Sequence, residues 1–119
     1  MLADYKFLKT ITVLGIGRVG IYLKVEEDYL GVDMLDFQDN KEIVQQLDEG
    51  NIWAYAIVTI LAMVENITEV FGTDTLGGCN YYDEQQFLLD GYYSDMESAA
   101  IEDLSTKLKD LKERLAQLE

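Results

Sequence analysis

Three glycines near the N-terminus form the pattern in this chain that most resembles a cofactor site. Gly15, Gly17 and Gly20 match G-x-G-x-x-G behind an apolar run, and Asp36 lies 21 residues after the first glycine. In dinucleotide-binding folds such glycines let a pyrophosphate approach a helix N-terminus, and an acidic residue ~20 positions further on binds the ribose. That helix would have to span residues 18–30. Because apolar and polar side chains alternate there instead, we expect no cofactor. A dinucleotide-binding Rossmann-like protein is kept as the second alternative function.

Nucleophilic and metal chemistry has few side chains available. The chain contains no histidine and one cysteine, Cys79. This composition excludes Ser-His-Asp and Cys-His catalytic sets, an internal disulfide and the common zinc sites. Neighbouring carboxylates disfavour a thiolate, so we expect Cys79 to be a buried structural thiol. The expectation is a protein that is not an enzyme and that holds no metal.

Carboxylates are the most abundant functional groups. The 119 residues include 23 acidic and 9 basic side chains, which gives a formal net charge of −14. Between Val25 and Thr106 there are 19 acidic residues and one basic residue, Lys41. Such a surface repels phosphates, so direct nucleic-acid binding is excluded. It can instead occupy the cationic nucleic-acid cleft of another protein, as a DNA mimic does. The alternative is an acidic surface that only confers solubility.

Tyrosines accompany these carboxylates. The pairs Tyr81-Tyr82 and Tyr92-Tyr93 are each followed within two residues by an acidic side chain. Tyrosine is a favoured interface anchor, and its ring can stack on arginine. We expect Tyr82 and Tyr92 to pack into the core and Tyr81 and Tyr93 to meet the partner. The predicted partner-binding residues are Glu26, Glu27, Asp28, Tyr81, Asp83, Glu84, Asp90, Tyr93 and Asp95.

An apolar seam runs along the last part of the chain at the 3 and 4 spacing of a short coiled coil. Its members are Ile101, Leu104, Leu108, Leu111, Leu115 and Leu118. A parallel homodimer would set Lys107 near Lys112 of its mate, a like-charge contact. The seam therefore favours docking on its own domain or on the acidic body of a second subunit. An oligomeric structural or assembly protein, with a possible homodimer, is the first alternative function.

These side chains would be carried by one α+β domain over residues 1–119, a small antiparallel sheet with a short helix and a long C-terminal amphipathic helix. Residue alternation and β-branched composition predict strands at 7–14, 20–26, 52–64 and 67–72. Capping residues and helical periodicity predict helices near 40–49, 83–89 and 95–118. Gly77-Gly78 is expected to form a turn, and a capping box from Ser94 to Glu97 is expected to open the last helix.

The run from Ile52 to Val64 is the core of this prediction. Its 13 residues fall short of the ~20 that a membrane-spanning helix needs. As a strand it would place the small Ala54, Ala56 and Ala62 on one face, which lets the C-terminal helix lie close. The N-terminus lacks the basic and apolar run of a signal peptide, and the cysteine usage fits a reducing compartment.

A local pattern lies in the middle of the chain. It consists of Asp74-Thr75-Leu76-Gly77-Gly78-Cys79-Asn80-Tyr81 and then Gly91-Tyr92-Tyr93-Ser94-Asp95-Met96, with the aromatic run of residues 53–64 before it. In these features, over roughly residues 50–101, the chain resembles small acidic proteins encoded by bacteriophages and prophages. The resemblance implies a phage origin and assigns no activity. By association it favours an inhibitor of host defence or DNA-handling machinery.

The expected function is therefore binding without catalysis. The chain would act in the cytoplasm of a host cell, where its anionic face would occupy the nucleic-acid cleft of a basic host protein such as a defence nuclease. Neither nucleic acid nor a membrane is an expected direct partner.

Overall fold

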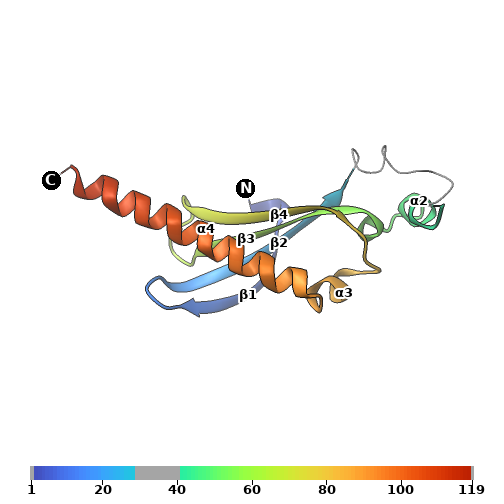
Figure 1. Cartoon of the computed structure of the whole chain (residues 1–119), viewed down its shortest axis with the longest axis horizontal. Helices are drawn as coiled ribbons and strands as arrows, with labels where there is room; N and C mark the ends of the chain where they lie inside the picture. The colour runs from blue at the N-terminus through green and yellow to red at the C-terminus, as the bar shows by residue number, and fades with distance from the viewer. Residues whose placement is uncertain (1, 29–40, 119) are drawn as a thin grey trace.

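The chain folds into a four-stranded antiparallel sheet with one long helix across a face of it (Figure 1). A computed structural model describes residues 2–28 and 41–118. The strands pair in chain order as a simple meander and are β1 (Lys6–Val13), β2 (Gly17–Glu27), β3 (Ala56–Val64) and β4 (Phe71–Cys79). This arrangement confirms the predicted α+β class.

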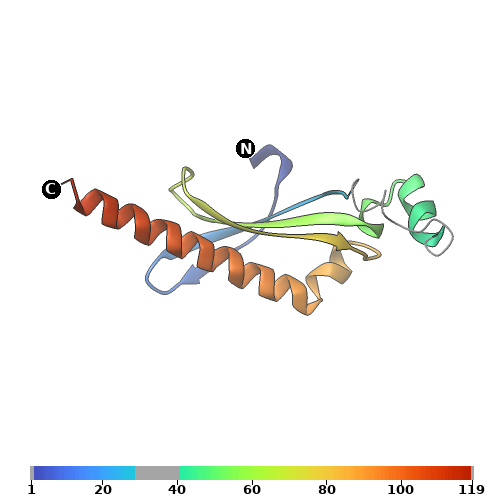
Figure 2. The ribbon, with the colours of Figure 1, turned by 45° about the horizontal axis from the view of Figure 1, so that its top comes forward.

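The helices lie at the ends of the sheet and along one face. They are the 3-10 turns η1 (Leu2–Asp4) and η2 (Ile52–Ala54) and the helices α2 (Lys41–Asp48), α3 (Glu84–Leu88) and α4 (Gly91–Ala116). The molecule is elongated, at 62 × 25 × 24 Å. Figures 1 and 2 show α4 extending past the sheet toward the C-terminus, with α2 at the opposite end of the molecule.

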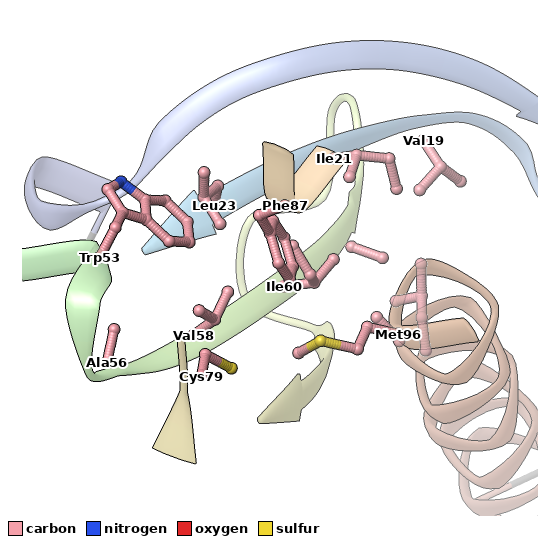
Figure 3. Packing of buried hydrophobic residues seen from close by; sticks show 13 residues of the cluster. Val19, Ile21, Leu23, Trp53, Ala56, Val58, Ile60, Cys79, Phe87 and Met96 are labelled. Atoms are coloured by element: carbon pink, nitrogen blue, oxygen red, sulfur yellow. The ribbon is translucent and has the colours of Figure 1, made fainter. Parts of the chain in front are cut away.

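The core lies between α4 and the sheet face that it covers. Along β3 the even-numbered residues Val58, Ile60 and Ala62 point toward the helix and are fully buried. From the helix, Met96, Ala100 and Leu104 fill the same layer. Trp53 and Phe87 close the end near α3, as Figure 3 shows. Their ring centroids are 5.4 Å apart. Of the three alanines predicted on the helix-facing side of this strand, Ala56 and Ala62 lie in β3 and are buried, whereas Ala54 lies in η2.

Two of the predicted strands differ from the structure at their ends. Residues 52–54 form η2 before β3 begins, and Asn51 caps this turn by accepting a hydrogen bond from the backbone N of Trp53 at 3.2 Å. The predicted strand at 67–72 is wrong, because β4 begins at Phe71 and continues to Cys79.

Gly77 and Gly78 form a β-bulge rather than the predicted turn. Ala56 pairs with Cys79 and Val58 pairs with Leu76, so one residue of β3 lies opposite both glycines. Such a bulge often needs a residue in the left-handed region, and Gly78 has φ 65°. A glycine pair that favours a turn therefore also fits a bulge, and the pairing with β3 selects the bulge.

The start of α4 also differs from the prediction. The helix begins at Gly91, and Asp90 caps it by accepting a hydrogen bond from the backbone N of Tyr92 at 3.0 Å. Ser94 therefore lies inside the helix, and Glu97 forms an ion pair with Lys9 instead of closing a capping box. The predicted capping box is wrong because the earlier aspartate offers an acceptor one turn ahead of it.

Candidate functional site

The elements at the end of the molecule opposite the C-terminus are rich in carboxylates, and we call this end the acidic end. Figure 1 shows where these elements lie. The acidic end comprises the last residues of β2, η2, α2, α3 and the first turns of α4, and Asn51 connects these parts by donating to Gln46 Oε1 at 2.9 Å and to the carbonyl of Tyr82 at 3.3 Å. Its described carboxylates are Glu26, Glu27, Asp28, Glu42, Asp48, Glu49, Asp83, Glu84, Asp90 and Asp95. Among the described residues of α2, η2, α3 and the first turns of α4, the one cation is Lys41.

Several predicted partner-binding acids have structural contacts. Asp83 caps α3 by accepting from the backbone N of Gln86 at 2.9 Å. Asp90 caps α4 with one carboxylate oxygen, and with the other it accepts from the hydroxyl of Tyr81 at 3.0 Å. Asp28 is buried and accepts from the backbone N of Gly78 at 2.9 Å. The fold therefore holds these three carboxylates in fixed positions.

Two further predicted acids form ion pairs. Glu84 pairs with Lys6 of β1, and Glu26 pairs with Lys24 at 3.6 Å. Asp95 is exposed on α4, and Glu27 is half-buried at the end of β2. The structure thus places the predicted acids at one end of the molecule, although only some of them are directed mainly at solvent.

Tyr81 and Tyr93 pack against the core, so the prediction that they are the exposed members of their pairs is wrong. The ring of Tyr81 lies 5.4 Å from that of Phe87, and the ring of Tyr93 lies 5.7 Å from it on another side. Burial, followed by the hydrogen bond to Asp90, raises the pKa of Tyr81 to about 12. Burial also raises the pKa of Tyr93. Both phenols are part of the packing.

Tyr82 and Tyr92 are the exposed rings, with 74% and 59% of their surfaces accessible. The signals for this arrangement are in the sequence. Tyr81 continues the alternation of β4 two residues after the buried Cys79, and Tyr93 lies three residues before Met96 on the buried stripe of α4. The aromatic rings available to a partner are therefore those of Tyr82 and Tyr92.

Two hollows flank the segment that carries these rings. One, of about 370 Å³, lies between α2 and α3, with Glu42, Ile43 and Tyr82 in its lining. The other, also about 370 Å³, lies beside the bulge, with Asp90 and Tyr92 in its lining. The lining of the first is mainly polar, with Ile43 and Ala54 as apolar members, and the lining of the second is mainly apolar; each includes a carboxylate. Side chains of an incoming protein that are both apolar and cationic suit such hollows.

The opposite end of the molecule, which we call the tail end, has exposed leucines and cations. Only part of the predicted seam packs on the domain: Leu104 is buried, and Ile101 and Leu108 are half-buried against the core. The remaining seam residues are exposed where α4 passes the sheet; they are Leu111, Leu115 and Leu118. The prediction that the seam docks on its own domain is therefore correct for the first half of the seam only.

A third hollow, of about 380 Å³, lies at the tail end between α4 and the turn that joins β1 to β2. Leu14, Ile16 and Leu108 supply its apolar lining, and Lys109 and Lys112 supply its cations. We include the exposed Arg114 in the tail end as well. Arg114 forms an ion pair with Asp110 at 3.1 Å. Cations and apolar side chains are therefore exposed together here.

The three glycines near the N-terminus form part of a β-hairpin. Gly15 and Gly17, with φ of 86° and 115°, shape the turn between β1 and β2, and Gly20 lies within β2 opposite Thr10. A pyrophosphate site of the predicted kind needs a helix after the glycines, and β2 occupies that position. Asp36 lies outside the described residues. The glycines therefore have a conformational role in this hairpin.

Cys79 is buried, as predicted. Burial raises the pKa of its thiol, and the nearby carboxylate of Asp28 raises it further. A thiol in this state is a poor nucleophile. Among residues 2–28 and 41–118, no group of three or more metal-ligating side chains comes together.

No family model, curated protein or solved structure matches the chain. Of the helices that the structure describes, none has the length and apolar character needed to cross a membrane. The arrangement of charge and exposed rings is therefore the basis for a functional proposal.

Proposed function

We propose that this protein binds without catalysis, and that its acidic end occupies the nucleic-acid cleft of a basic host protein as a DNA mimic. The observation that carries the proposal is the position of the charges. The carboxylates of α2, α3 with its cap Asp83, and the start of α4 share one end of an elongated molecule, and the single cation of those elements is Lys41. The resemblance to small acidic phage and prophage proteins favours a host nucleic-acid-binding or defence protein as the partner, met in the host cytoplasm.

The contacts of the acidic end support this chemistry. Helix capping fixes Asp83 and Asp90, so two carboxylates are presented with little loss of side-chain freedom on binding. Tyr82 and Tyr92 stand beside them, and arginines of a phosphate-binding cleft can stack on such rings while pairing with the acids. Complementary charge also speeds encounter and makes binding sensitive to salt.

The first experiment is affinity capture of host nucleic-acid-binding proteins on the immobilised chain, followed by elution with duplex DNA. The charge variant replaces Glu42→Gln, Asp48→Asn and Glu49→Gln on the exposed surface of the acidic end. Its matched control replaces Glu69→Gln, Glu102→Gln and Glu113→Gln, which are also exposed but lie outside that end. Both variants have the same net charge, so only the position of the charge differs.

We expect wild type and control to retain a DNA-binding protein that duplex DNA releases, and the charge variant to lose it. Equal retention by both variants would show that net charge alone, rather than the acidic end, drives capture. Retention that DNA cannot reverse would contradict occupation of a nucleic-acid cleft.

The exposed Leu111, Leu115 and Leu118 favour a second candidate function, an oligomeric structural or assembly protein. Sedimentation analysis tests it, since a tight oligomer that persists at high salt and is lost on Leu111→Glu with Leu115→Glu would support assembly as the main role.

A further inference from the structure

The two ends of the molecule are complementary to each other. Leu111 and Leu115 are exposed on α4 beyond the sheet, and Lys109 and Lys112 of the same helix line the hollow at the tail end. At the acidic end, Tyr82 is exposed beside the carboxylate of Glu42 at a hollow whose lining is mainly polar and includes the apolar side chains of Ile43 and Ala54. Each end thus exposes apolar side chains, and the charges that accompany them are opposite in sign at the two ends.

We propose that the tail end of one molecule docks on the acidic end of a second copy, so that the chain associates head to tail. The leucines of α4 would meet the hollow between α2 and α3, and Lys109 and Lys112 would approach the carboxylates around it. The inference rests on the same acidic end as the proposed function but concerns this chain alone.

The geometry of one molecule prevents the tail from reaching its own acidic end. The long axis measures 62 Å, and Figures 1 and 2 show the C-terminal end of α4 extending away from α2. A second copy is therefore needed. A contact between two different surfaces is heterologous, and it leaves one free end of each kind on every assembly, so growth continues beyond a dimer unless a ring closes.

Charge favours this arrangement over pairing of two tails. Two tails packed in parallel through the leucine seam would set Lys107 near Lys112 of the mate, and like charges at a helix interface are unfavourable. Head-to-tail docking pairs cations with acids instead. The acidic ends of neighbouring copies would be separated by about the length of a molecule, far beyond the ~8 Å over which charges interact at physiological salt.

The test uses two variants that each remove one surface. The tail variant carries Leu111→Glu and Leu115→Glu, and the acidic-end variant carries Glu42→Lys and Tyr82→Lys; all four side chains are exposed, so folding is retained. Ile67→Glu, an exposed residue of the turn between β3 and β4, is the matched control. Circular dichroism confirms that each variant is folded, and sedimentation velocity measures mass.

We expect the mass of the wild type and the control to rise with concentration beyond a dimer at low salt. The rise should weaken between ~0.01 M and ~0.15 M ionic strength, where the Debye length falls from ~30 to ~8 Å. Each surface variant alone should remain a monomer. An equimolar mixture of the two should form a dimer of twice the monomer mass and grow no further, because only one complementary pair of surfaces is left.

Three results would overturn the inference: a wild type that stays monomeric at every concentration, an acidic-end variant that still dimerises alone through its tails, or a mixture that contains monomers only. None of them bears on the proposed partner, because the tail variant keeps the acidic end intact and can be used in the capture experiment as a monomer.

Discussion

Gly72 of β4 lies directly beneath the backbone of Ala100 in α4. A Cβ atom placed on this glycine would collide with the carbonyl oxygen of Ala100 and the backbone N of Leu104, and it would lie 2.9 Å from the Cα of Leu104. The helix can therefore approach the sheet only because residue 72 has no side chain. This contact holds α4 in line with the sheet, so it sets the direction in which the tail end projects.

Gly72→Ala should destabilise the fold by about 3 kcal/mol, at the upper end of the usual cost of overpacking, because backbone atoms cannot move aside as a flexible side chain can. Urea denaturation measures the loss. The matched control is Gly91→Ala at the start of α4, where nothing lies within 4 Å of an added Cβ. That variant should be unchanged or slightly more stable, because alanine is favoured over glycine in a helix. Equal stability of the two variants would contradict the packing described.

Tyr81 should make stability depend on alkaline pH. Its pKa in the folded protein, about 12, lies above the ordinary value of 10.0. The folded state therefore holds this proton more tightly than the unfolded chain, so the stabilisation is complete below pH 10 and is lost as the pH rises toward 12. Tyr81→Phe should cost about 1 kcal/mol at pH 7, from the lost bond to Asp90, and should show a smaller decline in alkali. Urea denaturation at pH 7, 10 and 11.5 measures the free energy of unfolding of wild type and variant. Equal losses of stability in the two proteins as the pH rises would contradict this role of Tyr81.

Asp103 should contribute in the acid range. It accepts hydrogen bonds from the backbone N of Thr73 at 3.0 Å and from Lys107, and these bonds lower its pKa below the ordinary value of 3.8. Its stabilisation is therefore present above about pH 4 and is lost as the pH falls through the lowered pKa. Asp103→Ala should cost about 1 kcal/mol at pH 7, since the side chain is 37% exposed and solvent screens it. The difference from wild type should shrink below pH 4; a constant difference would contradict this role.

The two members of the first tyrosine pair should respond differently to truncation. Tyr81→Ala removes a ring packed on Trp53 and Phe87 and should cost roughly 2–4 kcal/mol, as core truncations do. Tyr82→Ala removes an exposed ring and should change stability by less than about 0.5 kcal/mol. Thermal denaturation gives both values. A large loss from the second variant would place its ring in the core rather than on the binding surface.

Residue patterns in the sequence predicted an element correctly where one face of that element is buried along its length. The alternation of Ile21, Leu23 and their polar neighbours predicted β2 because the face of that strand that carries Ile21 and Leu23 is part of the buried core. The prediction that Tyr93 is exposed failed because the predicted last helix began at Asp95. The buried face of the actual helix begins earlier, at Tyr93. Moving the helix start to Gly91 adds the turn that carries this ring to the core.

Contacts between distant parts of the chain could not be predicted. Asp28 and Gly78 are 50 residues apart, and only the pairing of β2, β3 and β4 brings the carboxylate to that backbone N–H. The cap formed by Asp83 is local and agrees with the predicted helix at 83–89, whereas the cap formed by Asp90 is equally local but was missed. The gathering of charge at one end of the molecule depends on the meander and on α4, so it became visible only in the fold.

The most direct test of the central claim is a competition between this chain and duplex DNA for one purified basic partner, measured by the fluorescence anisotropy of labelled DNA. We predict that the chain displaces the DNA completely, that the Glu42, Asp48 and Glu49 variant does so about tenfold less tightly, a change of about 1.4 kcal/mol, and that the matched control differs little from wild type. A ternary complex, in which the partner holds the DNA and this chain together, would contradict the account.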